Sequence, residues 1–589
     1  MKRVISLVLC LMLVLSLTTV AFAEEHSHTI TIHNSNAGYT YEAYQIFAGT
    51  LGSNGVLSDI SWGTGVNGDA LLSDLQSKLP AYASCTDAKQ VAAALAQNDT
   101  MDDPDVVAFA ELVRMHLTGI KVESTWDSAT QKYTISGLND GYYFVNNPGV
   151  PDTPNTTHSR YILEVVRDVA VTHKGTYPSV EKDIIEEQVE KKVNEASIGE
   201  AVNYQIVGTL PSRLDYYSTY YYAFSDTLSK GLTFNNDVTV TVNGVDVTKY
   251  FYVGTEPYAG TDTNDKYVGG TSLTVGIQDL LALELLEDPS VGDINKDTQV
   301  ILTYSATVND NAKVAMEGNP NKVKLVYDNN PNKDGEGSVK PPENPSEPTP
   351  PSTIGETPES EVETYTTELT IQKKDGAGKV LAGAEFTLSG DSVISTIVTR
   401  KDFALAEEGV TATHWELKDG TFTSVAPVFD NPETTDANED TSHGYKEPGT
   451  ADAPASATHY LKETKETINK TEGVEVKAEV GPDGLVTFTG LGAGTYTLTE
   501  SKTPDGFNTI NPITFKVEFN PTTKKFTADN NLILEEADNT LFTEIINVAG
   551  TTLPSTGGMG TTLFYIFGGI MVAGAAVLLI TKKRMGAES

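Results

Sequence analysis

The residues of this chain that are best suited to chemistry form a short peptide near its C-terminal end, Leu553-Pro554-Ser555-Thr556-Gly557. Pro554 fixes its own φ and prevents a helix, so the peptide is expected to be extended. Gly557 has no side chain, which lets the backbone of another protein approach closely. These properties suit a peptide that an enzyme grips, and we interpret the stretch as a substrate segment.

No other motif for catalysis or ligand binding is evident. The sequence contains no His-Glu-x-x-His, phosphate loop, nucleotide fingerprint or Ser-His-Asp order. His26 and His28 could bind a metal, but a solvated terminus is the simpler interpretation. Cys85 lies beside predicted helices and is typical of a small core residue. We therefore expect no metal, no cofactor and no enzyme activity toward other molecules.

Both ends of the chain have targeting patterns. Two cations at positions 2 and 3, an apolar run over 4–17 and the small-residue stretch 21–23 predict a secretory signal peptide over residues 1–23. Residues 563–580 contain no charge and are followed by three cations at 582–584. This pattern predicts a transmembrane helix with its C-terminal end in the cytoplasm. The protein is therefore expected to be exported and retained at the membrane.

The composition narrows the possible partners and covalent links. The 589 residues include 41 Lys and Arg against 80 Asp and Glu, a formal charge of −39 at pH 7. Such an acidic chain argues against nucleic acid as a partner. Cys10 leaves with the signal peptide, so Cys85 is the only cysteine of the mature chain and no intramolecular disulfide can form. An exported chain of this kind is expected to need another covalent link.

Short strand patterns between Gly, Asn and Asp turns predict an all-β protein of tandem Ig-like sandwiches. Three segments between strands of the first domain have helical spacing, and each begins with Asp, which suits an N-cap. A polar stretch at roughly 391–480 is interpreted as an insertion of uncertain order. The segments that we assign are 1–23 (signal peptide), 24–175 (β domain with a helical insertion), 176–330 (second β-sandwich), 331–364 (Pro- and acid-rich linker), 365–550 (third β domain with the long insertion) and 551–589 (substrate peptide, transmembrane helix and basic tail).

The C-terminal peptide, followed by glycines, an apolar span and a basic tail, resembles the sortase sorting signal of Gram-positive surface proteins. In that family, cleavage falls between Thr556 and Gly557, and the span retains the substrate until it is cut. Other stretches, in their order along the chain, resemble the shaft pilins with self-formed isopeptide bonds. These stretches are YEAYQIFAGTL in the first domain, PSVEKDI, YAFSDTLSKGLTF and NPNKVKLVYDNNP in a second domain of the CnaA type, and KKDGAGKVLAGAEFTL, YTLTESKTPDGF and EIINV in a third domain of the CnaB type.

The resemblance implies a reaction within the second domain. In such domains a Lys amine attacks an Asn side-chain amide and ammonia leaves, with a carboxylic acid as proton shuttle. The amine must be neutral and the acid protonated, which an apolar core favours. The matching residues are Lys182 as nucleophile, Asp226 as acid and Asn321 as electrophile, the last favoured because a strand starts on it. The other candidates for the electrophile are Asn319, Asn329 and Asn330.

In the third domain the same resemblance implies Lys373 as nucleophile, Glu500 as acid and Asn547 on the final strand as electrophile. Lys374 is the obvious competitor of Lys373. Strand alternation decides between them, because Lys373 shares a face with two apolar residues before it and Lys374 points the other way. The bond would tie the first strand of the domain to the last.

A shaft subunit also needs an exposed lysine that receives the Thr556 acyl group of its neighbour. The family usually places it in a Tyr-Pro-Lys motif at the end of the N-terminal domain. Lys174 stands in the corresponding place, eight positions before Lys182. The motif departs from the family pattern here, because His173 replaces the proline and a Tyr-Pro pair follows the lysine.

The resemblance therefore implies a structural pilus shaft subunit in the cell wall, locked by two isopeptide bonds. A pilin-type sortase would join Thr556 to Lys174 of the next subunit, and a housekeeping sortase would attach the fibre to peptidoglycan. Other copies of the chain and ancillary pilins would be partners, and a host surface ligand is left open. Two alternatives share most motifs: a monomeric wall-anchored adhesin that binds a host matrix protein or glycan, and an ancillary base pilin. A wall-bound enzyme is disfavoured for lack of another catalytic constellation.

Overall fold

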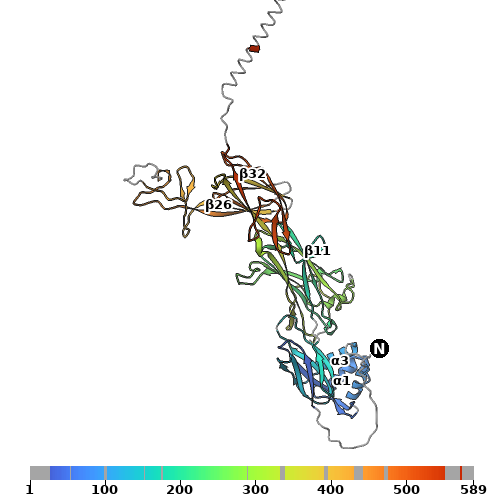
Figure 1. The fold of residues 1–589 in the computed structure, drawn as a ribbon. Coiled ribbons are helices and arrows are strands. Elements are labelled where there is room, and N and C mark those ends of the chain that lie inside the picture. Colours follow the sequence, from blue (N-terminus) through green and yellow to red (C-terminus); the bar gives the residue numbers. More distant parts are fainter. Residues whose placement is uncertain are drawn as a thin grey trace, which may run out of the picture. The chain divides into compact units, whose positions relative to one another are not determined.

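The computed structural model describes residues 27–53, 55–97, 103–151, 153–173, 177–287, 290–331, 338–390, 395–429, 442–469, 475–550 and 571–572. Strands dominate it, and the predicted all-β class is confirmed. The chain divides into two compact units, Met1–Thr366 with Pro521–Lys524 and Thr367–Asn520 with Lys525–Ser589 (Figure 1). The signal peptide, Lys174, the peptide 553–557 and all but two residues of 563–580 lie outside the described residues. Within the described ranges, no helix is long and apolar enough to cross a membrane.

Two sheets form the N-terminal part of the first unit. One contains, in spatial order, β5 (Thr125–Asp127), β6 (Lys132–Leu138), β1 (His28–His33) and β9 (Val169–Thr172). The other contains β3 (Leu57–Trp62), β2 (Thr40–Leu51), β7 (Gly141–Gly149) and β8 (Arg160–Val165), with β4 (Val122–Glu123) paired to β2. Ile30 and Tyr133 of the first sheet pack with Val145 of the second in one apolar core.

The predicted helical insertion lies between β3 and β4. It contains α1 (Gly68–Lys78), α2 (Ala88–Leu95) and α3 (Pro104–Met115). These helices pack against the second sheet through a separate core that includes Phe47, Phe109 and Phe144. Asp87 and Asp103 cap α2 and α3, whereas the cap of α1 is Asn67, whose side chain accepts from the backbone of the first turn.

The middle part of the first unit is a sandwich of two larger sheets. One contains β11 (Val189–Lys191), β10 (Val180–Glu186), β13 (Ala201–Gly208), β20 (Val300–Val308), β16 (Thr239–Val242) and β17 (Val245–Asp246), with β15 (Leu232–Phe234) paired to β20. The other contains β12 (Val193–Glu195), β23 (Ser360–Tyr365), β21 (Asn319–Asp328), β14 (Tyr222–Leu228), β19 (Thr271–Ile277) and β18 (Tyr252–Pro257), with β22 (Ile354–Glu356) paired to β21.

Part of the segment predicted as a linker forms strands of this second sheet. Both β22 and β23 run antiparallel to β21. Within β23, Val362 is buried while its neighbours Glu361 and Glu363 are more exposed. The acid- and proline-rich composition of 331–364 hid this alternation, because only every second residue of a strand with one buried face needs to be apolar.

The second unit is also a sandwich. One sheet contains β29 (His459–Asn469), β26 (Ser395–Leu405), β31 (Leu485–Leu491), β24 (Thr367–Asp375), β36 (Leu541–Asn547) and β35 (Leu534–Glu535). The other contains β30 (Val476–Glu479), β25 (Glu385–Gly390), β32 (Gly494–Lys502), β33 (Ile513–Asn520) and β34 (Lys525–Ala528). Its first strand, β24, pairs in parallel with its last long strand, β36.

The described part of the insertion, whose order the sequence left open, is a folded ribbon. β26 and β29 pair along their full lengths, whereas only residues 397–399 of β26 also pair with β31 (Figure 1). β27 (Trp415–Glu416) and β28 (Phe422–Thr423) form a small separate sheet, and Phe422 stacks on Phe403 of β26 with ring centroids 4.3 Å apart. The described residues also form short 3₁₀ helices, η1 (Pro80–Tyr82), η2 (Leu214–Tyr216), η3 (Thr248–Tyr250), η4 (Leu281–Leu285), η5 (Ala315–Glu317) and η6 (Ser442–Gly444).

Candidate functional site

Three of the predicted residues meet in the core of the middle sandwich. Lys182 lies on β10 in one sheet, and Asp226 and Asn321 lie on β14 and β21 in the facing sheet. Leu228 is opposite Asn321 in the antiparallel register, so Asp226 and Asn321 are diagonal neighbours on one face. Strand alternation directs Lys182 inward together with the apolar residues two positions before and after it.

The polar atoms of these side chains are in contact. Lys182 Nζ donates to Asn321 Oδ1 at 2.7 Å and forms an ion pair with Asp226. Tyr304 on β20 adds a fourth member: its hydroxyl accepts from Lys182 Nζ at 2.8 Å and from Asn321 Nδ2 at 2.7 Å, and it donates to Asp226 Oδ1 at 3.1 Å. Lys182, Asp226 and Asn321 are at most 1% exposed. The four side chains therefore form a closed network inside the core.

Burial changes the ionisation of this network. It lowers the pKa of Lys182 to about 8, although the charge of Asp226 acts in the opposite direction. Burial also raises the pKa of Asp226, against the influence of Lys182 and of the Tyr304 hydrogen bond. Both shifts favour transfer of a proton from the amine to the carboxylate. A neutral amine in contact with an amide can act as a nucleophile.

Of the four candidate asparagines, the structure brings Asn321 to Lys182. The Asn319 amide is held by a neighbouring loop, where Oδ1 accepts a backbone N–H at 2.8 Å and Nδ2 donates to a carbonyl at 2.9 Å. The Asn329 amide donates to the backbone of β22 at 2.9 Å. The Asn330 backbone N–H donates within its own turn at 3.1 Å.

The second predicted group lies in the core of the second unit. Lys373 on β24 and Asn547 on β36 belong to neighbouring parallel strands, and Asp375 is the register partner of Asn547. Lys373 and Asn547 are therefore two positions apart on one face of the sheet. Glu500 reaches them from β32 in the facing sheet. The three side chains are between 0% and 3% exposed.

In this group the acid contacts the amide directly. Asn547 Nδ2 donates to Glu500 Oε2 at 2.9 Å and to the Asn508 carbonyl at 2.5 Å. Lys373 Nζ donates to the Ile545 carbonyl at 3.2 Å and lies 3.9 Å from Glu500 Oε1. Among the described residues, neither Glu500 Oε1 nor Asn547 Oδ1 has a hydrogen-bond partner. Burial lowers the pKa of Lys373, which favours the nucleophilic form of its amine.

The competing lysine has the opposite orientation. The Lys374 side chain is 24% exposed and forms an ion pair with Glu544. Lys373 is fully buried, as the alternation along this strand predicts.

Sequence reasoning missed Tyr304, which contacts all three residues of the middle group. A signal was present, because Tyr304 occupies an inward position of β20 among aliphatic residues. A buried Tyr hydroxyl needs a polar partner, so a Tyr on the inward face of this strand points to a polar group in the core.

The chain just before Lys174 is well anchored. The His173 backbone N–H donates to the His33 carbonyl at 2.9 Å, and its ring nitrogen Nδ1 lies 3.0 Å from the Tyr41 hydroxyl. Burial lowers the pKa of His173 to about 4, so its ring is neutral near pH 7. The residue that replaces the family's proline is thus a fixed point at the end of β9, whereas Lys174 itself lies outside the described residues.

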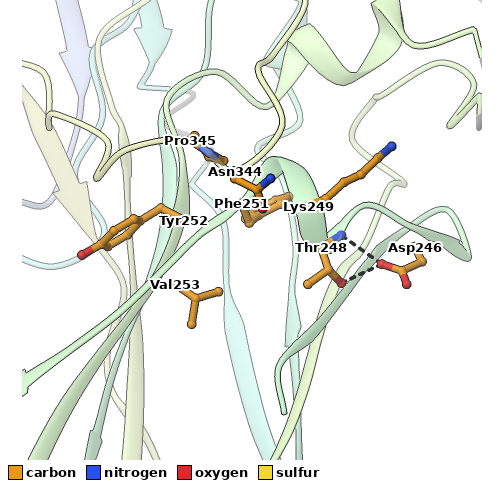
Figure 2. A pocket seen from close by; sticks show the side chains of 8 residues that line it. All are labelled: Asp246, Thr248, Lys249, Phe251, Tyr252, Val253, Asn344 and Pro345. Carbon is orange, nitrogen blue, oxygen red and sulfur yellow. Dashed lines mark hydrogen bonds between the residues drawn. The ribbon is translucent and has the colours of Figure 1, made fainter. Parts of the chain in front are cut away.

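Another concave region of the described chain offers no comparable chemistry. Figure 2 shows a surface pocket lined by Asp246, Thr248, Lys249, Phe251, Tyr252, Val253, Asn344 and Pro345. Asp246 accepts from the backbone and the hydroxyl of Thr248 at 2.9 and 2.6 Å, and Lys249 pairs with Glu343 at 2.6 Å. Its charged groups therefore have partners already. Across the described ranges, no group of three or more His, Cys, Asp or Glu is placed to hold a metal ion.

Three family models match separate parts of the chain. Residues 198–331 match the Gram-positive pilin backbone subunit 2, Cna-B-like domain, residues 455–532 a prealbumin-like fold domain, and residues 546–585 the LPXTG cell wall anchor motif. These matches give the chain a Gram-positive pilin backbone domain and an LPXTG cell wall anchor. The matched pilin domain is described as Cna-B-like, whereas the sequence resemblance assigned residues 176–330 to the CnaA type.

This backbone pilin is similar to the trypsin-resistant surface T6 protein of Streptococcus pyogenes serotype M6, with 26% identity over 425 residues, or 70% of each chain. Similar solved structures include the T6 backbone pilin of S. pyogenes, with 15% identity, a TM-score of 0.48, and coverage of 90% of this chain and 100% of that one. The major pilin SpaD from Corynebacterium diphtheriae has 18% identity, a TM-score of 0.42, and coverage of 90% and 99%.

The predicted role and location are confirmed. The protein is a structural pilus subunit, exposed outside the cell and anchored to the cell wall. As an LPXTG-anchored backbone pilin it is processed by sortase, polymerised with other pilin subunits and attached to peptidoglycan.

Proposed function

We propose that this backbone pilin closes two intramolecular isopeptide bonds without an enzyme, one between Lys182 and Asn321 and one between Lys373 and Asn547. The buried network around Lys182 is the observation that supports this proposal most directly. Its amine nitrogen is 2.7 Å from the amide oxygen of Asn321 and is paired with the buried Asp226 carboxyl. Fixed orientation of this kind replaces a bimolecular encounter, so a single turnover needs no separate catalyst.

The reaction is the same at both sites. The lysine Nζ attacks Cγ of the asparagine, the new Cγ–Nζ bond forms, and the Cγ–Nδ2 bond breaks. The carboxyl group delivers a proton toward Nδ2 and receives one from Nζ, so it is unchanged at the end. One ammonia leaves for each bond, and no oxidant or cofactor is needed.

Burial supplies the driving force as well as the geometry. A buried amine next to a buried acid is costly to keep charged. In the second unit, the unpartnered Glu500 Oε1 and Asn547 Oδ1 add the cost of unsatisfied polar atoms. Condensation removes the charged form of the lysine, and it provides the covalent link that the mature chain, from which Cys10 has been removed, cannot make through a disulfide.

For polymerisation, we propose that a pilin-type sortase cleaves after Thr556 and joins its carbonyl to Lys174 of the next subunit. A housekeeping sortase then transfers the finished fibre to peptidoglycan, with ancillary pilins as further subunits. The LPXTG anchor match supports the cleavage site, and the pilin backbone match favours this polymer over a monomeric adhesin. The fixed backbone at His173 supports Lys174 as an acceptor that starts from an ordered strand end.

The intact mass of residues 24–552 tests the two bonds. The wild-type chain is expected to weigh about 34 Da less than its sequence, because two ammonias are lost. Lys182→Ala and Lys373→Ala should each restore about 17 Da, and the matched control Lys374→Ala should restore none. A wild-type mass equal to that of the plain sequence would contradict the proposal.

A further inference from the structure

The two proposed bond sites differ in how the acid reaches the leaving nitrogen. In the second unit, Glu500 Oε2 accepts directly from Asn547 Nδ2 at 2.9 Å. In the middle sandwich, the hydrogen bond that the structure gives Asn321 Nδ2 is to the Tyr304 hydroxyl, at 2.7 Å. That hydroxyl is bonded to Asp226 Oδ1 at 3.1 Å. The tyrosine oxygen thus stands between the acid and the nitrogen that must leave.

The shorter acid explains this arrangement. The aspartate side chain is one methylene shorter than glutamate, so its carboxyl group stays closer to its own strand. Asp226 reaches the attacking amine of Lys182, with which it forms an ion pair, and its other oxygen faces Tyr304. Tyr304 lies on the sheet of Lys182, and Asn321 lies on the sheet of Asp226. A hydroxyl from the opposite sheet therefore fills the place that the longer glutamate fills in the other site.

Tyr304 is also placed to do more than fill space. Its hydroxyl makes three hydrogen bonds to three different reacting side chains, and the residue is 3% exposed. Burial raises the pKa of this phenol well above its usual value, so the hydroxyl keeps its proton until another proton replaces it. These are the properties of a group that passes a proton along without becoming charged.

We propose that Tyr304 is a catalytic residue of the middle-domain bond, which relays the proton from Asp226 to the leaving amide nitrogen. This inference rests on the proposed isopeptide chemistry. When the tetrahedral intermediate collapses, the Tyr304 hydroxyl gives its proton to Nδ2 of Asn321 and takes one from the protonated Asp226. Both hydrogen bonds reverse direction, the Cγ–Nδ2 bond breaks, and ammonia leaves. Asp226 then accepts the surplus proton of Lys182 Nζ, and Tyr304 ends as it began.

The test measures the rate of ammonia loss in the chain that remains after both termini are processed, residues 24–556, with Lys373→Ala so that one bond remains. Chain that is isolated unfolded from inclusion bodies, and whose mass shows that it has not yet lost ammonia, is refolded by dilution from denaturant, and samples are quenched and weighed. Tyr304→Phe is expected to slow the loss of about 17 Da by a factor on the order of 100, the usual size of a general acid–base contribution. Tyr222→Phe is the matched control, because its buried hydroxyl donates to the Thr209 carbonyl and, within the described part of the chain, to none of the three proposed reactants.

A double variant separates relay from packing. Asp226→Glu in the Tyr304→Phe chain supplies the missing methylene, so the acid should contact Nδ2 directly and recover at least about tenfold of the rate. A Tyr304→Phe chain that reacts at the parental rate would overturn the relay, and so would a slow folded variant that the glutamate does not rescue. If Tyr304→Phe fails to fold, the parental chain provides the test. Its rate of ammonia loss in H₂O/D₂O mixtures should depend on the D₂O fraction along a curve, as for a step in which two protons move, and a linear dependence would overturn the relay. Absence of any mass loss in the parental chain would instead refute the isopeptide proposal itself.

Discussion

Replacement of Asp226 by Asn is expected to leave the fold intact, prevent the middle-domain bond and lower thermal stability strongly. Asn has the same shape as Asp but cannot accept the proton of Lys182. The variant should therefore keep the ammonia that the wild type loses, which is a mass difference of about 17 Da. The lost charge itself adds little, because burial already lowers the pKa of Lys182 to about 8 and the amine can become neutral.

The magnitude follows from the loop that the bond closes. Lys182 and Asn321 are 139 positions apart. The chain-entropy relation for a crosslink gives about 5 kcal/mol of stabilisation at 25 °C for a loop of this length. For a cooperative unit of the size of this sandwich, each kcal/mol corresponds to roughly 2–4 °C in Tm. Asp226→Asn should therefore lower the Tm of the middle sandwich by about 10–20 °C.

Calorimetry of residues 24–552, together with their intact mass, checks this expectation. Asp297→Asn is the matched control, since it removes the same charge from an exposed position of the same sandwich, where the side chain is 78% exposed. The control should keep the full mass deficit and the wild-type transition. The reasoning would be wrong if Asp226→Asn kept the deficit, or if it lost the bond and still melted within about 2 °C of the wild type.

Three further predictions concern the other groups. The rate of ammonia loss at Lys182, measured by mass during refolding, should fall above about pH 8. The Lys182–Asp226 pair then loses the one proton that its two members share, so no acid remains to protonate the leaving nitrogen. A rate that keeps rising up to about pH 9.5 would show that a neutral amine is sufficient. Glu500→Gln should retain one ammonia, so its mass deficit relative to its own sequence should be about 17 Da smaller than that of the wild type, whereas Lys374→Ala should keep the full deficit. Equal deficits for Glu500→Gln and wild type would remove Glu500 from the chemistry. Lys174→Ala should abolish the ladder of covalent multimers in boiled wall extracts, and a persistent ladder would mean that another lysine is the acceptor.

The sequence predicted those features that depend on strand alternation. Alternation along β24 separates Lys373 from Lys374, and the structure places the first inside and the second in an ion pair with Glu544. Strand order and the family resemblance together led to Asp226 and Asn321, which the structure places beside Lys182. These contacts follow from the alternation of residues along each strand together with the fold that the resemblance implies, so they could be predicted from the sequence.

Other features depend on contacts that no local pattern contains. The inward position of Tyr304 on β20 indicates that its hydroxyl needs a polar partner, but the partners are identified only when the facing sheet places Asn321 and Asp226 at that hydroxyl. The strands β22 and β23 were hidden in a linker composition, since their stability comes from pairing with β21 and not from their own propensity. The same holds for the ribbon of β26 and β29, whose two strands are separated by more than fifty residues in the sequence.

The positions of the two proposed bonds decide which parts of the subunit can extend when a pilus is pulled. Tension that enters at Lys174 and leaves at Thr556 passes from Lys373 to Asn547 through the second bond, so residues 374–546 are bypassed. The ribbon of β26 and β29 lies inside this bypassed stretch and can vary without bearing load. The first bond ends at Asn321, however, while β22 and β23 complete the same sheet after it. Residues 322–372, between the ends of the two proposed bonds, therefore have no covalent bypass, and their described strands are held by hydrogen bonds and side-chain packing. That segment, about 170 Å long when fully extended, is the part of the chain that we expect to yield before either proposed bond is loaded to breaking.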